Sequence, residues 1–267
     1  MTVADRQVTV LSYGGGVNSS ALLWGLYERE QLPNAVLFAD TGGEFQHVYE
    51  TVERVRAFCE EQGVLFELVT NADPDGERHG HASLEDECHR NKTLPSLAFG
   101  FKGCSAKWKR QPMDRWVKAW PEAHKAWDRG RLVTRLLGID ADEAHRSANL
   151  TEDKLFRYER PLIDWGWGRE ECLEAVERSP FGPVGKSACW FCPAMKKREV
   201  LTLEREHPEL FARAVAMEHN ALENLGTTKG LGRSWAWETL VAADKAQLKL
   251  FPESIDEACG CYDGENA

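Results

Sequence analysis

The sequence predicts an α/β protein with a doubly wound, mostly parallel sheet and a C-terminal helical cap. Short apolar runs alternate with longer segments of helical period over residues 7–70. A glycine-rich segment separates the first apolar run from the first helical segment, and the chain after Pro193 has a largely helical pattern. Alternation of this kind favours parallel strands with right-handed crossovers, and binding sites then lie beyond the carboxyl ends of the strands.

The spacing of apolar residues predicts the individual elements. Strand, helix, strand, helix and strand are expected in turn over residues 7–12, 19–30, 35–40, 46–61 and 64–70. Two later apolar runs predict further strands over residues 131–138 and 157–163. Residues 71–101 are polar and have no clean period, so we expect a long and functional loop there. The C-terminal helices are expected over residues 195–206, 208–225 and 237–250.

Composition excludes several classes of protein. The 267 residues are 42% hydrophobic and 28% charged, which excludes general disorder. A net charge of −10 argues against a broad basic face that grips nucleic acid unaided. No run approaches about 18 apolar residues, and the N-terminal segment lacks a secretory pattern. We therefore expect a cytoplasmic protein without membrane contact, whose eight cysteines serve thiol or metal chemistry rather than disulfides.

The strongest local signal lies at residues 12–20, between the first strand and the first helix. Its glycines allow a tight turn with inward-pointing amides, and the polar residues after them begin a helix, where an anion is favoured. We predict a phosphate-binding loop made of Ser12, Tyr13, Gly14, Gly15, Gly16, Asn18, Ser19 and Ser20. A capped turn without a ligand is the alternative.

Two familiar phosphate loops do not fit this chain. A Walker A motif requires a glycine five residues before its Gly-Lys-Ser, and the only such tripeptide, residues 185–187, has Pro180 there. The dinucleotide fingerprint accepts Gly14 and Gly16 but meets Ser19 where its third glycine belongs. The loop is therefore of another type.

The loop resembles the PP-loop of the ATP pyrophosphatase and sulfonucleotide reductase superfamily, whose pattern is approximately Ser-Gly-Gly-x-Asp-Ser. Gly15, Gly16 and Ser19 match this pattern. Gly14 stands where the family usually has Ser, and Asn18 stands where Asp is usual. The loop therefore keeps the backbone of the motif but lacks one hydroxyl and one carboxylate.

Later segments extend the resemblance to about residues 7–195. The second strand ends in Asp-Thr-Gly at residues 40–42, which is similar to the turn of phosphoadenylylsulfate (PAPS) reductases. Gly138, Ile139 and Glu143 are similar to a Gly-Ile-Arg-x-x-Glu segment of the family, with Asp140 replacing the Arg. Residues 161–165 match Pro-Leu-x-Asp-Trp. The resemblance implies an adenine nucleotide alpha-hydrolase-like fold, with the nucleotide domain over residues 1–194 and a helical extension over residues 195–267.

The resemblance also implies ATP and Mg²⁺ as ligands, with attack on the α-phosphate and departure of pyrophosphate. Loop amides, Ser19 and Ser20 are expected to stabilise the leaving charge. Asp40 is expected to orient the ribose or help hold Mg²⁺, with an ordinary turn residue as the alternative. The remaining nucleotide contacts are expected at Thr41, Gly42 and Gly138. Lys107 is a catalytic candidate within a basic stretch at residues 102–118, which suits a triphosphate, a nucleic-acid backbone or simply a solvated helix face.

The cysteines suggest a second centre. Cys189 and Cys192 form a CxxC, which is compatible with zinc, an iron–sulfur cluster or redox chemistry. Cys88 and Cys104 could close a four-thiolate site with this pair. We favour a [4Fe-4S] cluster, because sulfur-handling members of the superfamily often carry one, and structural Zn²⁺ is the alternative. Two further thiols, Cys59 and Cys172, sit within helical patterns and are expected to be buried.

The C-terminal tail argues against one branch of the family. PAPS reductases use a Glu-Cys-Gly-x-His ending, and Cys259 with Gly260 matches only its centre. Ala258 replaces the Glu, the His is missing, and Cys261 occupies the variable site. Adenylylsulfate reductases also place two adjacent Cys at their cluster, and this chain has no Cys-Cys.

The sequence therefore predicts an ATP pyrophosphatase that adenylates an acceptor for sulfur incorporation. Its nearest likeness is the PAPS-reductase-like component of DNA phosphorothioation systems. That likeness implies a cysteine desulfurase and DNA-modification proteins as partners, with nucleic acid presented by a partner. The alternatives are a sulfonucleotide reductase that acts on PAPS or adenylylsulfate with thioredoxin, and a nucleotide-binding module without turnover.

Overall fold

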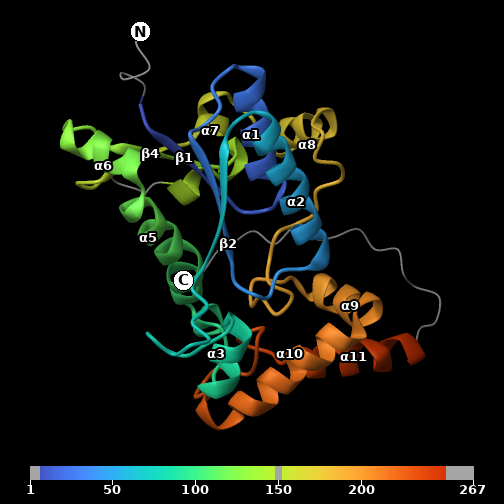
Figure 1. The fold of residues 1–267 in the computed structure, drawn as a ribbon. Helices are drawn as coiled ribbons and strands as arrows, with labels where there is room; N and C mark the ends of the chain where they lie inside the picture. Colours follow the sequence, from blue (N-terminus) through green and yellow to red (C-terminus); the bar gives the residue numbers. More distant parts are fainter. Residues whose placement is uncertain (1–6, 148–151, 251–267) are drawn as a thin grey trace.

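A five-stranded, all-parallel sheet forms the centre of the molecule (Figure 1). The computed structural model describes residues 7–147 and 152–250. The strands are β1 (Thr9–Tyr13), β2 (Ala35–Asp40), β3 (Leu65–Thr70), β4 (Val133–Leu137) and β5 (Phe156–Glu159). Helices flank both faces of the sheet, so the fold is α/β and compatible with a doubly wound arrangement.

The strand order β3-β2-β1-β4-β5 places the first strand at the centre. The chain fills one side of β1 with β2 and β3, and later fills the other side with β4 and β5. In register, Ser12 of β1 lies between Leu37 of β2 and Leu137 of β4. The carboxyl ends of β1 and β4 therefore flank the point where the order reverses, which is where ligands bind in open parallel sheets.

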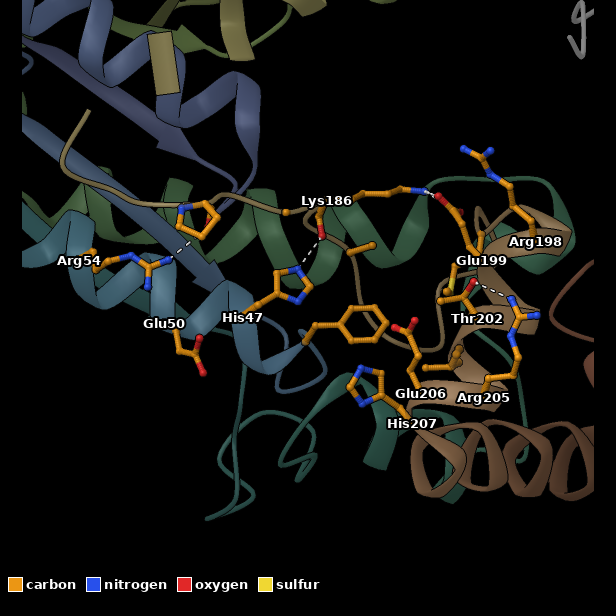
Figure 2. A pocket seen from close by; sticks show the side chains of 16 residues that line it. His47, Glu50, Arg54, Lys186, Arg198, Glu199, Thr202, Arg205, Glu206 and His207 are labelled. Atoms are coloured by element: carbon orange, nitrogen blue, oxygen red, sulfur yellow. Dashed lines mark hydrogen bonds and ion pairs between the residues drawn. The ribbon is translucent and has the colours of Figure 1, made fainter. Parts of the chain in front are cut away.

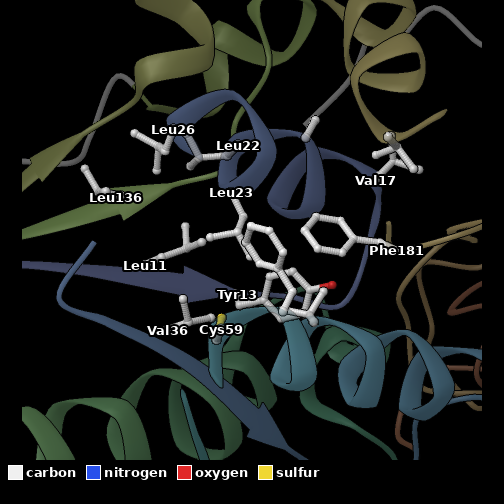
Figure 3. Close-up of a cluster of buried hydrophobic side chains, with 14 of the residues drawn as sticks. Leu11, Tyr13, Val17, Leu22, Leu23, Leu26, Val36, Cys59, Leu136 and Phe181 are labelled. Atoms are coloured by element: carbon white, nitrogen blue, oxygen red, sulfur yellow. The ribbon is translucent and has the colours of Figure 1, made fainter. Parts of the chain in front are cut away.

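The two faces of the sheet are covered by different helices. α1 (Val17–Glu28), α2 (Gln46–Glu61) and α8 (Arg169–Arg178) pack on one face around Leu11, Val36 and Leu136 (Figure 3). α5 (Gln111–Ala119) and α6 (Pro121–Asp128) pack on the other face around strand residues such as Val10 and Val133. Because both faces are buried, the central strands appear in the sequence as continuous apolar runs.

A third hydrophobic core lies outside the sheet, in the lower part of Figure 1, and joins residues 84–108 to the C-terminal helices. It contains α3 (Leu84–Arg90), the π-helical turn η3 (Ala106–Arg110), α9 (Lys197–Glu206), α10 (Pro208–Ala221) and α11 (Trp237–Leu250). Trp108 and Trp237 are fully buried in it. The buried Glu218 carboxylate accepts hydrogen bonds from the amides of Leu231 and Trp237, and burial raises the pKa of Glu218. The C-terminal helices thus share a core with residues 84–108, and the domain boundary after residue 194 stays a prediction.

Short elements connect the layers. They are the helices α4 (Gly103–Ser105) and α7 (Pro161–Asp164) and the 3-10 segments η2 (Ser96–Phe99), η4 (Ala141–Ser147) and η5 (Leu222–Asn224). Within the described ranges, no helix has the length and apolarity needed to cross a membrane.

The structure confirms the elements with strong periodicity and corrects two others. β2 and α2 have the predicted bounds. The loop expected over residues 71–101 instead contains α3 and η2, so that prediction was wrong. The Ser83 hydroxyl caps α3 by accepting from the amide of Asp86, while only Leu84 and Cys88 are buried, which is too short a stripe to show a period. The strand expected over residues 157–163 ends at Glu159, and Pro161 begins a helical turn.

Candidate functional site

The predicted phosphate loop joins β1 to α1 and lines a cavity of about 340 Å³ at the reversal point of the sheet, which we call the phosphate cavity after this prediction. Six residues predicted from the sequence line it: Ser12, Gly14, Gly16, Asn18, Ser19 and Gly138. The other lining residues are Val17, Glu143, Arg169, Lys186 and Ser187. The structure therefore brings the loop and the end of β4 together, as the motif order predicts.

Three glycines are required by the close approach of neighbouring chain segments. Gly15 has a φ of +76°, and a Cβ on it would lie 2.7 Å from a methyl group of Val48. A Cβ on Gly16 would lie 2.6 Å from the Ser187 hydroxyl. A Cβ on Gly138 would lie 2.9 Å from both the amide nitrogen and the Cα of Ser19. Glycine at these positions lets β4 and residues 185–187 touch the start of α1.

Ser19 holds the shape of the loop. Its hydroxyl donates to the carbonyl of Gly16 at 3.0 Å and accepts from the amide of Gly14 at 3.2 Å. Gly16 caps α1 without a side chain, and the first amides of a helix have no partner within the helix. This end of α1 carries partial positive charge beside the cavity, which favours an anion.

Two of the three departures from the PP-loop family pattern contact each other. Asn18 donates from Nδ2 to the buried Asp140 carboxylate at 2.8 Å. Arg169, at the start of α8, donates to Oδ1 of Asn18 at 3.1 Å and lines the cavity. The family pattern has Asp in the loop and Arg two residues after the later glycine. In this chain the Asn18 amide faces the Asp140 carboxylate instead, and Arg169 supplies a cation.

Residues 185–187 contribute a wall that the sequence analysis missed. Lys186 and Ser187 line the cavity, and the Lys186 amine contacts both carboxylate oxygens of Glu199 at 2.8 Å. These residues form a Gly-Lys-Ser tripeptide in the sequence, but the tripeptide does not fit a Walker A motif and so was not assigned to the phosphate site. Only the tertiary fold places it against a phosphate loop located far earlier in the chain.

Tyr13 and Ser20 contribute side chains to the core rather than to the cavity. Their hydroxyls share a hydrogen bond of 2.9 Å, and both residues are buried. Burial raises the pKa of Tyr13 well above its usual range. The geometry therefore gives no support to the catalytic role expected for Ser20.

The Asp-Thr-Gly turn after β2 lies outside the lining of the cavity. Oδ1 of Asp40 accepts from the Gly42 amide and the Tyr49 hydroxyl, each at 2.8 Å. Burial, together with Asp40, raises the pKa of Tyr49. Thr41 faces the other way, and its hydroxyl lies 3.2 Å from the sulfur of Cys189. This turn connects the sheet edge to the cysteines.

The four cysteines predicted as ligands lie in one hydrophobic cluster. Cys88 and Cys189 are buried, Cys104 and Cys192 are half-buried, and all four are free thiols. Burial raises the pKa of Cys88, Cys189 and Cys192, and repulsion from Cys104 adds to the effect on Cys88 and Cys192. Among the described residues, no three His, Cys, Asp or Glu side chains are already arranged to hold a metal ion.

The two other cysteines within the described ranges lie in the core of the sheet. Cys59 and Cys172 are fully buried, as expected, and burial raises the pKa of each thiol to about 12.

A buried ion pair adjoins the cysteines. The Lys109 amine lies 2.9 Å from Oε1 of Glu44, whose side chain is completely buried. Oε1 also accepts from the Thr41 hydroxyl at 3.2 Å, whereas Oε2 is buried without a hydrogen-bond partner. Burial acts to lower the pKa of Lys109, but attraction to Glu44 and Cys189 leaves it above its ordinary value.

Lys107 lies apart from the phosphate cavity, so the geometry does not support its expected role there. Its amine donates to Glu87, which also accepts from the indole nitrogen of Trp108. With Cys88 and Cys104 it lines a different cavity of about 310 Å³. Other cations of the basic stretch are also engaged internally, because Lys109 pairs with Glu44 and Arg115 donates to the Thr70 carbonyl and to Asn71.

Comparisons with known proteins add no relative. No model of a known protein family matches the sequence, and no curated protein matches it significantly. Cys259 and Cys261 lie outside the described residues. The site therefore rests on its motifs and its geometry.

Proposed function

We propose that this protein is a PP-loop ATP pyrophosphatase with an adenine nucleotide alpha-hydrolase-like fold, which adenylates an acceptor for sulfur incorporation in the cytoplasm. One observation carries the proposal. The loop after β1, the glycine after β4 and two cationic side chains line a single cavity at the reversal point of a parallel sheet. A local motif and the global topology thus point independently to the same place.

Each part of the cavity has a role in the proposed reaction. The start of α1 and the Ser19 region bind the phosphates, while Arg169 and Lys186 supply positive charge where pyrophosphate departs. Glu143 is the cavity carboxylate that fits a hard Mg²⁺ ion, which would neutralise phosphate charge when bound. Asp40 lies outside the lining of the cavity, so its role in orienting the ribose or holding Mg²⁺ stays a prediction from the sequence.

The thiol cluster suits a soft metal centre in its donor chemistry. We propose that Cys88, Cys104, Cys189 and Cys192 hold a [4Fe-4S] cluster, with structural Zn²⁺ as the alternative. Such a cluster, when bound, supplies electrons or holds the surrounding segments together. The Glu44–Lys109 pair lies beside Cys189, where the Glu44 carboxylate raises the pKa of the thiol more than Lys109 lowers it.

The partners follow from the same proposal. Sulfur would come from a cysteine desulfurase, and DNA-modification proteins would present the acceptor. One observation favours a second candidate, a nucleotide-binding module without turnover. Gly14 stands where the motif has Ser, and Asn18 stands where it has Asp, so a hydroxyl and a carboxylate of the usual motif are missing from the cavity.

Product analysis separates these functions. The full chain is incubated with ATP and Mg²⁺ while pyrophosphate is followed, and separately with PAPS and a thiol while sulfite is followed. Pyrophosphate without sulfite supports the proposal, sulfite indicates a reductase, and nucleotide binding with neither product indicates the binding module.

A substitution in α8 tests the site itself. Arg169→Met should lower pyrophosphate release by about tenfold or more, because it removes a cation from the cavity. Arg178→Met is the matched control, since Arg178 lies on the same helix and pairs with Glu28 on the surface. Equal rates for both variants would remove the cavity from the reaction.

A further inference from the structure

A second and larger cavity adjoins the phosphate cavity. It measures about 810 Å³ and lies between α2, residues 183–188 and α9 (Figure 2). Lys186 lines both cavities, and the next residue, Ser187, faces the phosphate loop. The segment of chain that contains Lys186 and Ser187 therefore separates the two cavities. The proposed ATP reaction needs an acceptor beside the triphosphate, and this cavity is next to it.

Three rings form a row along this cavity. Phe45 and His47 are stacked, with centroids 5.5 Å apart and planes at 21°. His207, from the end of α9, follows on with its centroid 5.9 Å from that of Phe45. His47 is fixed by a hydrogen bond of 3.2 Å to the Lys186 carbonyl, and both histidines are exposed. Exposed ring faces of this kind stack with the bases of single-stranded nucleic acid.

The charges of the cavity are not all engaged by the protein. Lys186 pairs with Glu199, and Arg54 donates to the carbonyl of Phe181. Arg198 has no hydrogen-bond or ion-pair partner in the part of the chain that the structure describes, and Arg205 contacts only the Thr202 hydroxyl, at 3.5 Å. Two exposed guanidinium groups are thus available for an anion, and guanidinium matches phosphate geometry.

Acidic side chains limit what the cavity accepts. Glu50 and Glu206 line it together with the arginines. They would repel a long polyanion, but a carboxylate accepts hydrogen bonds from the exocyclic amino group of a base. Rings, carboxylates and free guanidinium groups together suit one base with its phosphate rather than a duplex.

We propose that this cavity is the acceptor site and binds one nucleotide of a single-stranded nucleic acid, with its base against the His47–Phe45–His207 row and its phosphate at Arg198 and Arg205. The acceptor role rests on the proposed function, whereas the binding does not. In the reaction, an ionised oxygen of the bound phosphate group, which carries no proton, would form a bond to the α-phosphorus of ATP. The bond from that phosphorus to pyrophosphate would break, and the electron pair would leave with pyrophosphate.

Binding of a labelled oligonucleotide tests the proposal. A short single-stranded DNA is titrated with the full chain without ATP and followed by fluorescence anisotropy, with RNA of the same sequence and duplex DNA in parallel. Arg198→Gln and His207→Ala should each weaken binding by about tenfold. Lys197→Gln is the matched control, because Lys197 is an exposed cation of α9 that does not line the cavity. It should leave the affinity almost unchanged.

The outcomes distinguish this site from the ATP site. Single-strand binding that is weakened by the two cavity variants, but not by the control, supports the proposal. Absence of binding to both single strands, an equal loss in all three variants, or preference for the duplex overturns it, and the single strand that binds more tightly identifies the acceptor as DNA or RNA. If the cavity variants weaken ATP binding and leave single-strand binding unchanged, the cavity holds the adenosine of ATP instead. If a single strand binds as expected but no pyrophosphate is released, the acceptor site stands and the proposed reaction fails.

Discussion

The phosphate cavity and the cysteine cluster start from neighbouring strands but are built by different means. The cavity follows β1 and is shaped by glycines at close approaches, because Gly138 meets the backbone of Ser19, and Gly15 and Gly16 meet the side chains of Val48 and Ser187. The cluster adjoins the turn after β2 and is built from cysteines that three separate segments bring into one apolar core. The turn at residues 40–44 connects them, with Asp40 at the sheet edge and Thr41 against Cys189.

This difference predicts different sensitivities. A backbone-built cavity tolerates many side-chain changes but fails where a Cβ enters the space of another backbone. A centre built from side-chain donors fails when one donor is removed, whereas its surroundings adjust. Substitutions in the two regions therefore test whether each one depends on close approaches of the chain or on side-chain donors.

The largest effect is expected at the cysteines. Cys189→Ser should abolish binding of the metal centre, because it removes a donor from a four-thiolate site. The measurement is iron, zinc and acid-labile sulfide per chain after anaerobic purification. Cys172→Ser is the control, since this thiol is buried on α8 in a different hydrophobic cluster, and the metal content of the variant should equal that of the wild type. Unchanged metal in Cys189→Ser would contradict the four-thiolate assignment.

A smaller effect is expected where two backbones meet in the phosphate cavity. Gly138→Ala forces apart the end of β4 and the start of α1, which we expect to cost about 1–3 kcal/mol and to weaken ATP binding by about tenfold. Gly14→Ala is the matched control for stability within the loop, because its Cβ would meet only ordinary protein contacts at 3.8 Å. Calorimetric titration compares the ATP affinity of Gly138→Ala with that of the wild type, since Gly14 itself lines the cavity. Wild-type affinity in Gly138→Ala would show that backbone contact does not shape the site.

The same difference explains which residues of the site could be predicted from the sequence and which could not. The loop at residues 12–20 is local and precedes a strongly periodic helix, and the structure places six predicted residues in one cavity. Residues brought in by tertiary structure were missed, as Arg169 and Lys186 show. Helix α3 was missed because its cap and two buried residues give no period. Lys107 was assigned from charge alone, and its acceptor, Glu87, lies on that missed helix.

The sequence motifs locate a site segment more reliably than they show which way its side chains point. Ser20 belongs to the loop motif, yet its hydroxyl faces Tyr13 in the core, because α1 turns it away from the cavity. Thr41 belongs to the nucleotide motif after β2 but contacts Cys189. A motif therefore locates a segment, and only the helix or turn that follows determines which side chains face the ligand.

The smallest effect is expected at Asn18, where a substitution changes a side-chain hydrogen bond but leaves the backbone of the phosphate loop unchanged. Asn18→Asp replaces the amide that donates to Asp140 with a second carboxylate, and Arg169 offsets part of the repulsion. We expect a loss of about 1 kcal/mol in the free energy of unfolding at neutral pH. Repulsion raises the pKa of the new carboxyl group in the folded state. Its contribution to stability is therefore present below the unfolded pKa of about 3.9 and is lost as the pH rises through the folded value.

Urea unfolding at acidic and neutral pH measures this loss, and adding Asp140→Asn to the variant should restore stability at neutral pH. ATP affinity should change much less than in Gly138→Ala, because the backbone of the loop is untouched. A large loss of ATP affinity in Asn18→Asp, with stability unchanged, would instead mean that the amide itself contacts the nucleotide. The phosphate cavity would then depend on side-chain donors in the same way as the cysteine cluster.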